Sequence, residues 1–81
     1  MNVTVLFFAQ ARERAGRATA PLDLPDGSRV RDAIERLSRE HPGLAPLWPH
    51  LAIAVDGQLV DGAAELRHGA ELALLPPVSG G

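Results

Sequence analysis

At 81 residues the chain has room for one small domain and not for a second, and 46% hydrophobic residues are typical of a globular protein. It contains no cysteine, which excludes disulfides, a thiol nucleophile and thiolate metal ligands and favours a cytoplasmic location. The formal net charge of −2 argues against a general affinity for nucleic acid or for an anionic membrane surface. We expect no signal peptide or membrane span, because the first apolar run extends only from Val5 to Ala9.

The N-terminal third of the chain predicts two strands joined by a short helix. Apolar residues alternate over residues 3–8, and they include the β-branched and aromatic types that favour a strand. Residues 9–16, AQARERAG, are good helix formers that end on a glycine, which indicates one or two helical turns. Residues 18–25 predict a short strand at the edge of a sheet, because Pro21 interrupts it.

The clearest helix is expected to begin with Ser28 as its N-cap. Its apolar residues recur at i, i+3, i+4 and i+7, a stripe that must face a core: Val30, Ala33, Ile34 and Leu37. HPG, residues 41–43, ends this helix. The segment LAPLWPH, residues 44–50, contains two prolines and predicts an irregular loop with Leu47 or Trp48 packed against the core.

The C-terminal part predicts three more strands. LAIAV, residues 51–55, is expected to be a buried strand, and the Asp-Gly pair that follows is a strong hairpin signal leading into residues 58–60. The last strand is predicted over residues 71–75. One main amphipathic helix with four or five short strands predicts a two-layer α+β domain, with a mixed sheet and the helix on one of its faces.

Residues that could carry catalysis are scarce in the predicted domain. His41, His50 and His68 lack the spacing of metal ligands, and no serine lies in a nucleophile motif. The acidic residues fall at turns or on the helix face, so no pair of them resembles a general acid and base. The sequence therefore predicts no metal site and no catalytic site within the domain.

The ending PPVSGG differs from the rest of the chain. We expect residues 1–75 to form the domain and residues 76–81 to be a flexible tail. A glycine usage of about 7% gives two terminal glycines by chance in roughly 0.5% of chains. Pro76 and Pro77 cannot continue a sheet ladder and favour extended geometry, so they are expected to project the chain away from the domain.

The last four residues fit insertion into the active site of another protein. Val78 can anchor in an apolar pocket, whereas Ser79 and Gly80 offer little bulk and suit a narrow channel. The α-carboxylate of Gly81 is ionised at neutral pH and is a poor electrophile. Joining it to AMP would create a mixed anhydride that an amine, a thiol or a sulfide could attack.

Three segments together resemble the small, sulfur-carrying subunit of molybdopterin synthase over nearly the whole chain: VTVLFFAQARERAG, AVDGQLV and LLPPVSGG. The resemblance implies a β-grasp, ubiquitin-like fold and a subunit that binds no cofactor and is not catalytic alone. It implies that an adenylating enzyme uses ATP to activate Gly81, and that a sulfur donor then converts Gly81 to a thiocarboxylate. The tail would enter the active site of the large subunit and give its sulfur to cyclic pyranopterin monophosphate, in a heterotetramer with two carriers.

Carried over by position, Gly81 is the sulfur-bearing end and Pro76, Pro77, Val78, Ser79 and Gly80 form the inserted tail. The chain departs from the family at Asp56, where Asn is usual, and at Ala70, where Asp is usual. Both lie at turns that these residues can still make, so the departures leave the expected fold and tail chemistry in place.

Strand alternation also predicts a docking surface. If Val5, Phe7, Ile53 and Leu74 face the helix, the open face carries Leu6, Phe8, Ala52, Ala54 and Leu75. An apolar patch there would suit the large subunit or the activating enzyme, with Leu6, Phe8 and Leu75 as candidate contacts. Loops that cover this face are the alternative.

Three other functions remain open from the sequence. The chain could carry sulfur for thiamine-thiazole synthesis or tRNA thiolation, or it could be a protein modifier whose Gly81 forms isopeptide bonds with lysines. It could also be a plain β-grasp binding module, since seven of its eight basic residues, all arginine, lie within the first 40 residues.

Overall fold

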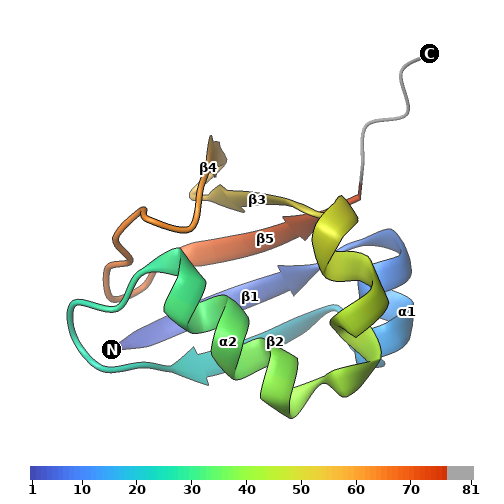
Figure 1. Ribbon diagram of the computed structural model, residues 1–81. Helices are drawn as coiled ribbons and strands as arrows, with labels where there is room; N and C mark the ends of the chain where they lie inside the picture. Colours follow the sequence, from blue (N-terminus) through green and yellow to red (C-terminus); the bar gives the residue numbers. More distant parts are fainter. Residues whose placement is uncertain (77–81) are drawn as a thin grey trace.

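A mixed five-stranded sheet with the main helix on one face forms the domain (Figure 1). The computed structural model describes residues 1–76, so the predictions for Pro77, Val78, Ser79, Gly80 and Gly81 lie outside the described residues. In chain order the elements are β1 (Asn2–Phe7), α1 (Ala9–Ala15), β2 (Thr19–Asp23), α2 (Val30–Glu40), the 3-10 helix η1 (Pro42–His50), β3 (Ala52–Val55), β4 (Gln58–Val60) and β5 (Glu71–Leu75). No helix within residues 1–76 is long and apolar enough to cross a membrane.

The strand order is β2-β1-β5-β3-β4. β1 and β5 run parallel at the centre, and the other neighbouring strands are antiparallel. Pro21 lies in the edge strand β2, whose outer side has no neighbouring strand. The missing N–H of proline therefore costs no hydrogen bond between strands on that side. The predicted α+β class, the mixed sheet and the edge position of the second strand are therefore confirmed.

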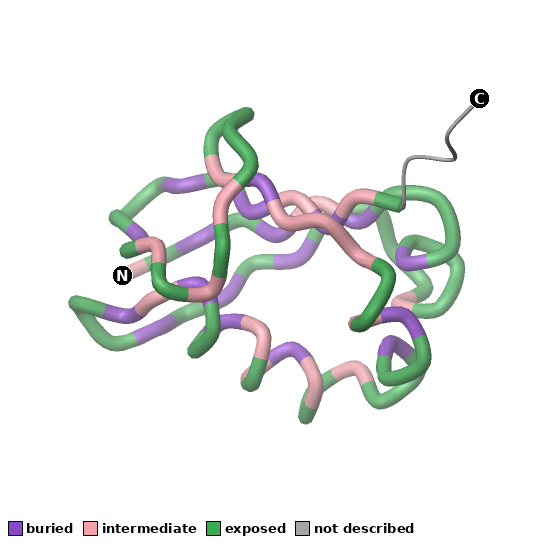
Figure 2. Tube along the Cα trace, turned by 45° about the horizontal axis from the view of Figure 1, so that its top comes forward, coloured by how far each residue is buried: buried purple, intermediate pink, exposed green. Residues whose placement is uncertain are grey.

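The core lies between the sheet and α2 (Figure 2). Val30, Ala33 and Leu37 form the inner stripe of α2 and are fully buried, as the apolar spacing predicts. They belong to the same apolar cluster as Val5 of β1 and Leu74 of β5, whose side chains are also inaccessible to solvent. Ile34, at the edge of the stripe, is only partly buried.

The N-terminus of α2 differs from the prediction. Arg29, not Ser28, occupies the N-cap position, and its backbone N–H donates to the Asp32 carboxylate at 2.8 Å. The Ser28 hydroxyl is committed elsewhere, because it donates to the carbonyl of Pro25 at 2.7 Å. The first N–H groups of the helix find partners in the loop before β5: Val30 donates to Ala64 O at 2.9 Å.

Residues 42–50 form the 3-10 helix η1, so the prediction of an irregular loop over residues 44–50 was wrong. Pro46 and Pro49 are three residues apart, which matches the three-residue repeat of a 3-10 helix, and the fixed φ of proline suits that geometry. Leu47 is buried, as predicted, and Trp48 is partly buried against the core.

The hairpin between β3 and β4 turns on Asp56 and Gly57, as predicted. Both residues have positive φ, +49° and +83°, as a type I′ turn requires. The Asp56 carboxylate also accepts a hydrogen bond from the backbone N–H of Glu71 at 2.9 Å, which ties the turn to β5. Because an amide oxygen would accept the same bond, aspartate replaces the asparagine usual in the family without changing this contact.

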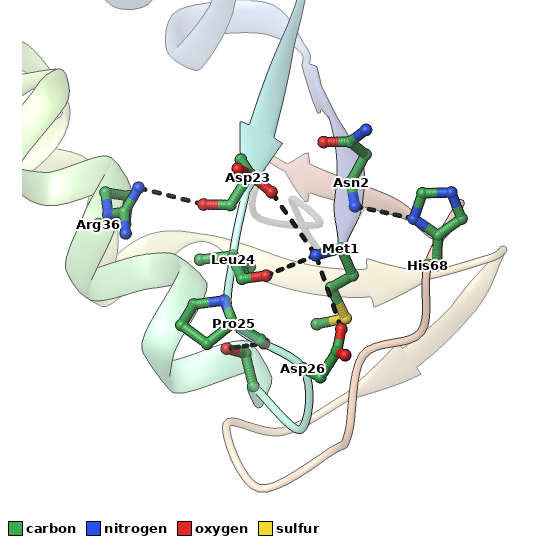
Figure 3. Close-up of polar contacts among 9 residues, drawn as sticks. Met1, Asn2, Asp23, Leu24, Pro25, Asp26, Arg36 and His68 are labelled. Carbon is green, nitrogen blue, oxygen red and sulfur yellow. Dashed lines mark hydrogen bonds and ion pairs between the residues drawn. The ribbon is translucent and has the colours of Figure 1, made fainter.

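Because β1 and β5 run parallel, the start of β1 lies at the end of the sheet opposite to Pro76. Polar contacts of the N-terminus hold it there. The Met1 ammonium donates to the carbonyl of Leu24 at 2.7 Å (Figure 3). It also lies 3.5 Å from a carboxylate oxygen of Asp23 and 3.7 Å from one of Asp26. These contacts join β1 to the chain just beyond the edge strand β2.

Candidate docking surface and tail root

The tail begins where β5 leaves the sheet. Pro76 directly follows Leu75, the last residue of β5, and its side chain is exposed. Because β5 pairs with β1 on one side and β3 on the other, two neighbours fix the point from which the tail starts. The remaining predicted tail residues lie outside the described part of the chain.

The open face of the sheet, on the side away from α2, carries a row of apolar side chains across four strands. Cα partners project to the same side of a sheet, and the register joins Leu6 to Ala73, Ala73 to Ala54, and Ala54 to Leu59. Leu75 pairs with Ala52 beside this row. These six residues form what we call the open-face patch.

Exposure within the open-face patch is uneven. Leu59 is 73% exposed, whereas Ala54 is only 5% exposed, because a small side chain in an inner strand is covered by its neighbours. Leu6 and Leu75 are half-buried. Within residues 1–76 the exposed large hydrophobic side chains are Phe8 and Leu59, so the patch includes one of the two.

Phe8 lies just past the end of β1, at the N-cap of α1, and is 44% exposed. It lines a hollow of about 370 Å³ together with Pro76, which brings a predicted docking residue and the tail root to the same site. The floor and walls are mostly apolar: Ala9, Ala11, Leu47 and Leu51, with Gln10 and His50 as polar members. We call this the tail-root pocket.

The chain turns sharply directly after Phe8. Ala9, the first residue of α1, has φ of +50°, a left-handed conformation that is uncommon for any residue other than glycine. The turn is held by the Phe8 carbonyl, which accepts hydrogen bonds from Ala11 and Arg12 at 3.0 and 3.3 Å. The unusual backbone conformation of Ala9 therefore lies between the exposed ring of Phe8 and the rest of α1.

The three histidines lie at separate places in the domain. His41 packs its ring against Phe7 with centroids 5.5 Å apart, and the Nδ1 atom of His68 accepts a hydrogen bond from the backbone N–H of Asn2 at 3.0 Å. His50 lies alone at the tail-root pocket. Within residues 1–76 no group of three or more histidine, aspartate or glutamate side chains could hold a metal ion.

Residues 5–81 match the sequence pattern of the ThiS family. The chain belongs to the ThiS family. It is 38% identical to the molybdopterin synthase sulfur carrier subunit of Drosophila yakuba, and the match covers 100% of this chain and 92% of that protein. The sequence resemblance described above is thereby confirmed.

Two solved structures show the same fold. SAMP1 of Haloferax volcanii, a small archaeal modifier protein, superposes with a TM-score of 0.89 at 30% identity and covers 100% of both chains. The molybdopterin-converting factor of Helicobacter pylori was solved as a complex of subunits 1 and 2, and the match has a TM-score of 0.73 at 28% identity and covers 100% of both chains. These likenesses confirm the predicted β-grasp, ubiquitin-like fold.

Sequence reasoning missed two parts of the site. Leu59 was not among the candidate docking residues, although the Asp-Gly turn fixes Val55 opposite Gln58 and therefore Ala54 opposite Leu59. The approach of η1 to the tail root was also missed, because no local pattern brings Leu47 and His50 near Pro76.

Proposed function

We propose that this protein is the sulfur-carrier subunit of a molybdopterin synthase, with Gly81 as the position that carries sulfur. The observation that carries the proposal is the match of the whole chain to a molybdopterin synthase sulfur carrier subunit. The Helicobacter pylori complex of subunits 1 and 2 supports a large subunit as partner. The protein would act in the cytoplasm, would bind no cofactor itself, and would become part of an enzyme only when bound to the large subunit.

In the proposed cycle, the Gly81 carboxylate attacks the α-phosphorus of ATP on an adenylating enzyme and pyrophosphate leaves. Hydrosulfide, released by the sulfur donor, then attacks the acyl carbon, the C–S bond forms, and AMP leaves with the bonding electron pair. In the large subunit the thiocarboxylate sulfur bonds to a side-chain carbon of cyclic pyranopterin monophosphate as an oxygen leaving group departs. Water then cleaves the acyl C–S bond and restores the Gly81 carboxylate. Each dithiolene needs two sulfur atoms, which agrees with two carriers in one heterotetramer.

The domain positions the tail for this chemistry. β5 brings the chain to Pro76 between two neighbouring strands, and the tail-root pocket and the open-face patch lie beside that point. A partner that contacts these surfaces would have the tail aimed into its active site before chemistry begins, which lowers the entropic cost of positioning the reacting atoms. Leu6, Phe8, Leu59 and Leu75 would make these contacts.

The test is an intact mass measurement after incubation with the adenylating enzyme, ATP and a sulfur donor. The proposal predicts a mass gain equal to one oxygen replaced by one sulfur. A variant that lacks Gly81 is the control, and it should show no gain. An unchanged mass of the full chain would refute the proposal.

The same incubation separates the sulfur carrier from a protein modifier. If lysine-containing proteins are added, a modifier would appear as higher-mass conjugates joined through Gly81. Conjugates in place of the thiocarboxylate would overturn the sulfur-carrier proposal. Addition of the large subunit and cyclic pyranopterin monophosphate then distinguishes molybdopterin synthesis from thiamine-thiazole synthesis and tRNA thiolation.

A further inference from the structure

Charge is distributed unevenly over the domain. Two of the three arginines of α2 are matched by acids, because Arg36 lies 3.9 Å from Glu40 and Arg39 lies 3.9 Å from Glu35. Arg31, the third, is exposed and takes part in none of the ion pairs among residues 1–76. Arg29, at the N-cap of α2, lies 3.5 Å from Glu65. Three of the seven arginines in the first half of the chain are therefore paired with acids.

α1 and the turn after it are different. Arg12 and Arg17 are exposed, and none of the ion pairs formed among residues 1–76 involves either of them. Both line an open hollow of about 510 Å³ whose only acidic member is Glu13. Two arginines against one glutamate make the hollow locally positive despite the formal net charge of −2.

This positive hollow adjoins the tail root. Ala9 lines the hollow and also lines the tail-root pocket, which contains Pro76. A protein that receives the tail and covers the tail-root pocket would therefore come close to the surface that Arg12 and Arg17 line. Figure 1 shows α1 at the end of the domain from which the chain continues past β5.

We propose that Arg12 and Arg17 form an electrostatic docking contact for an acidic surface on the large subunit, beside the mouth of its tail channel. This inference rests on the proposed function and adds the charge of the partner surface and its place relative to the tail. Exposed arginines near an interface rim raise the association rate and set orientation more than they lower the dissociation rate. A negative surface on the large subunit would attract this end of the carrier, which is the end from which the tail starts.

A protein partner fits these observations better than RNA. The positive surface is small, and the opposite end of the sheet carries Asp23 and Asp26 near Met1. No exposed aromatic side chain lines the positive hollow, although single-stranded RNA is usually held by stacking on such rings.

The test is the association rate with the large subunit, followed by stopped-flow fluorescence of a dye at an engineered cysteine far from α1. The variants are Arg12→Gln and the double variant Arg12→Gln/Arg17→Gln. Arg67→Gln and Arg31→Gln/Arg67→Gln are matched controls, because they remove the same charge at exposed positions near the other end of the sheet. Glutamine keeps a long polar side chain and a good helix propensity.

At about 20 mM salt the double variant should associate about 5- to 10-fold more slowly than the wild type, and the difference should nearly vanish at about 500 mM salt. The controls should stay within about twofold of the wild type. Arg17 also donates from Nε to the carbonyl of Thr19 at 2.6 Å, so thermal unfolding checks that the double variant is folded. The single variant keeps the test decisive, because the hydrogen bonds of Arg12 to Phe8 and Gly16 are made by its backbone N–H and carbonyl, which glutamine keeps.

Equal association rates and equal salt dependence for the α1 variants and their controls would overturn the inference while leaving the proposed function intact. If the wild type does not bind the large subunit at all, both the proposed function and this inference are refuted. Loss of binding to a single-stranded RNA oligonucleotide in the double variant, with association to the large subunit unchanged, would also overturn it.

Discussion

Replacing Leu59 with alanine should weaken binding of the large subunit and leave the free protein's stability almost unchanged. Full burial of a leucine side chain stabilises by about 1.5–3 kcal/mol. Leu59 is 73% exposed in the free protein, so its burial by a partner would contribute about 1–2 kcal/mol, most of which alanine removes. The dissociation constant should therefore rise about 6- to 30-fold.

The assay pairs titration calorimetry against the large subunit with urea unfolding of the free variant. The free energy of unfolding should change by no more than about 0.5 kcal/mol, because an exposed side chain makes few contacts in the folded state. An affinity within about twofold of the wild type, measured on a folded variant, would show that the open-face patch does not contact the large subunit.

Three other predictions test the fold and the tail. Leu74→Ala, at a fully buried position, should lower the free energy of unfolding by about 2–5 kcal/mol, and a urea midpoint equal to that of the wild type would contradict the packing described. Asp56→Ala removes the acceptor for Glu71 N–H and should cost about 1 kcal/mol, whereas Asp56→Asn keeps an acceptor and should cost less than about 0.5 kcal/mol; equal losses in thermal unfolding would exclude a role for this bond. Glycines in place of Pro76 and Pro77 should weaken binding of the large subunit roughly 4- to 30-fold, because the free tail then loses more conformational entropy when it binds. An unchanged affinity in titration calorimetry would show that the stiffness of the prolines does not contribute to binding.

Much of the fold follows from local patterns in the sequence. The Asp56-Gly57 turn, the apolar stripe of α2 and the edge position of Pro21 each rest on a rule that involves a few neighbouring residues, and each is confirmed. The cap of α2 was predicted wrongly because Ser28 finds a different partner in Pro25, a choice set by how the preceding turn folds. The 3-10 helix was missed because two prolines were interpreted as breakers, although their three-residue spacing fits that helix.

The candidate site depends more than the fold does on contacts between residues that are far apart in the sequence. Alternation within β1 and β5 placed Leu6 and Leu75 on the open face, but Leu59 joins them only through the register of β4 on β3. The tail-root pocket combines α1, η1 and Pro76, which are brought together by the sheet order and not by any sequence motif. The positive hollow depends on which arginines find acidic partners in the folded domain: Arg36 and Arg39 do, whereas Arg12 and Arg17 do not, and no sequence pattern distinguishes them.

Transfer of sulfur from Gly81 to the pterin is the central claim, and one labelling experiment tests it most directly. The protein is loaded with a heavy sulfur isotope at Gly81, purified, and mixed with the large subunit and cyclic pyranopterin monophosphate. We expect the label to appear in the dithiolene product while the mass of the protein returns to that of the carboxylate, with two carriers consumed per product. Label that stays on the protein, or product that forms without the label, would show that Gly81 is not the source of the sulfur.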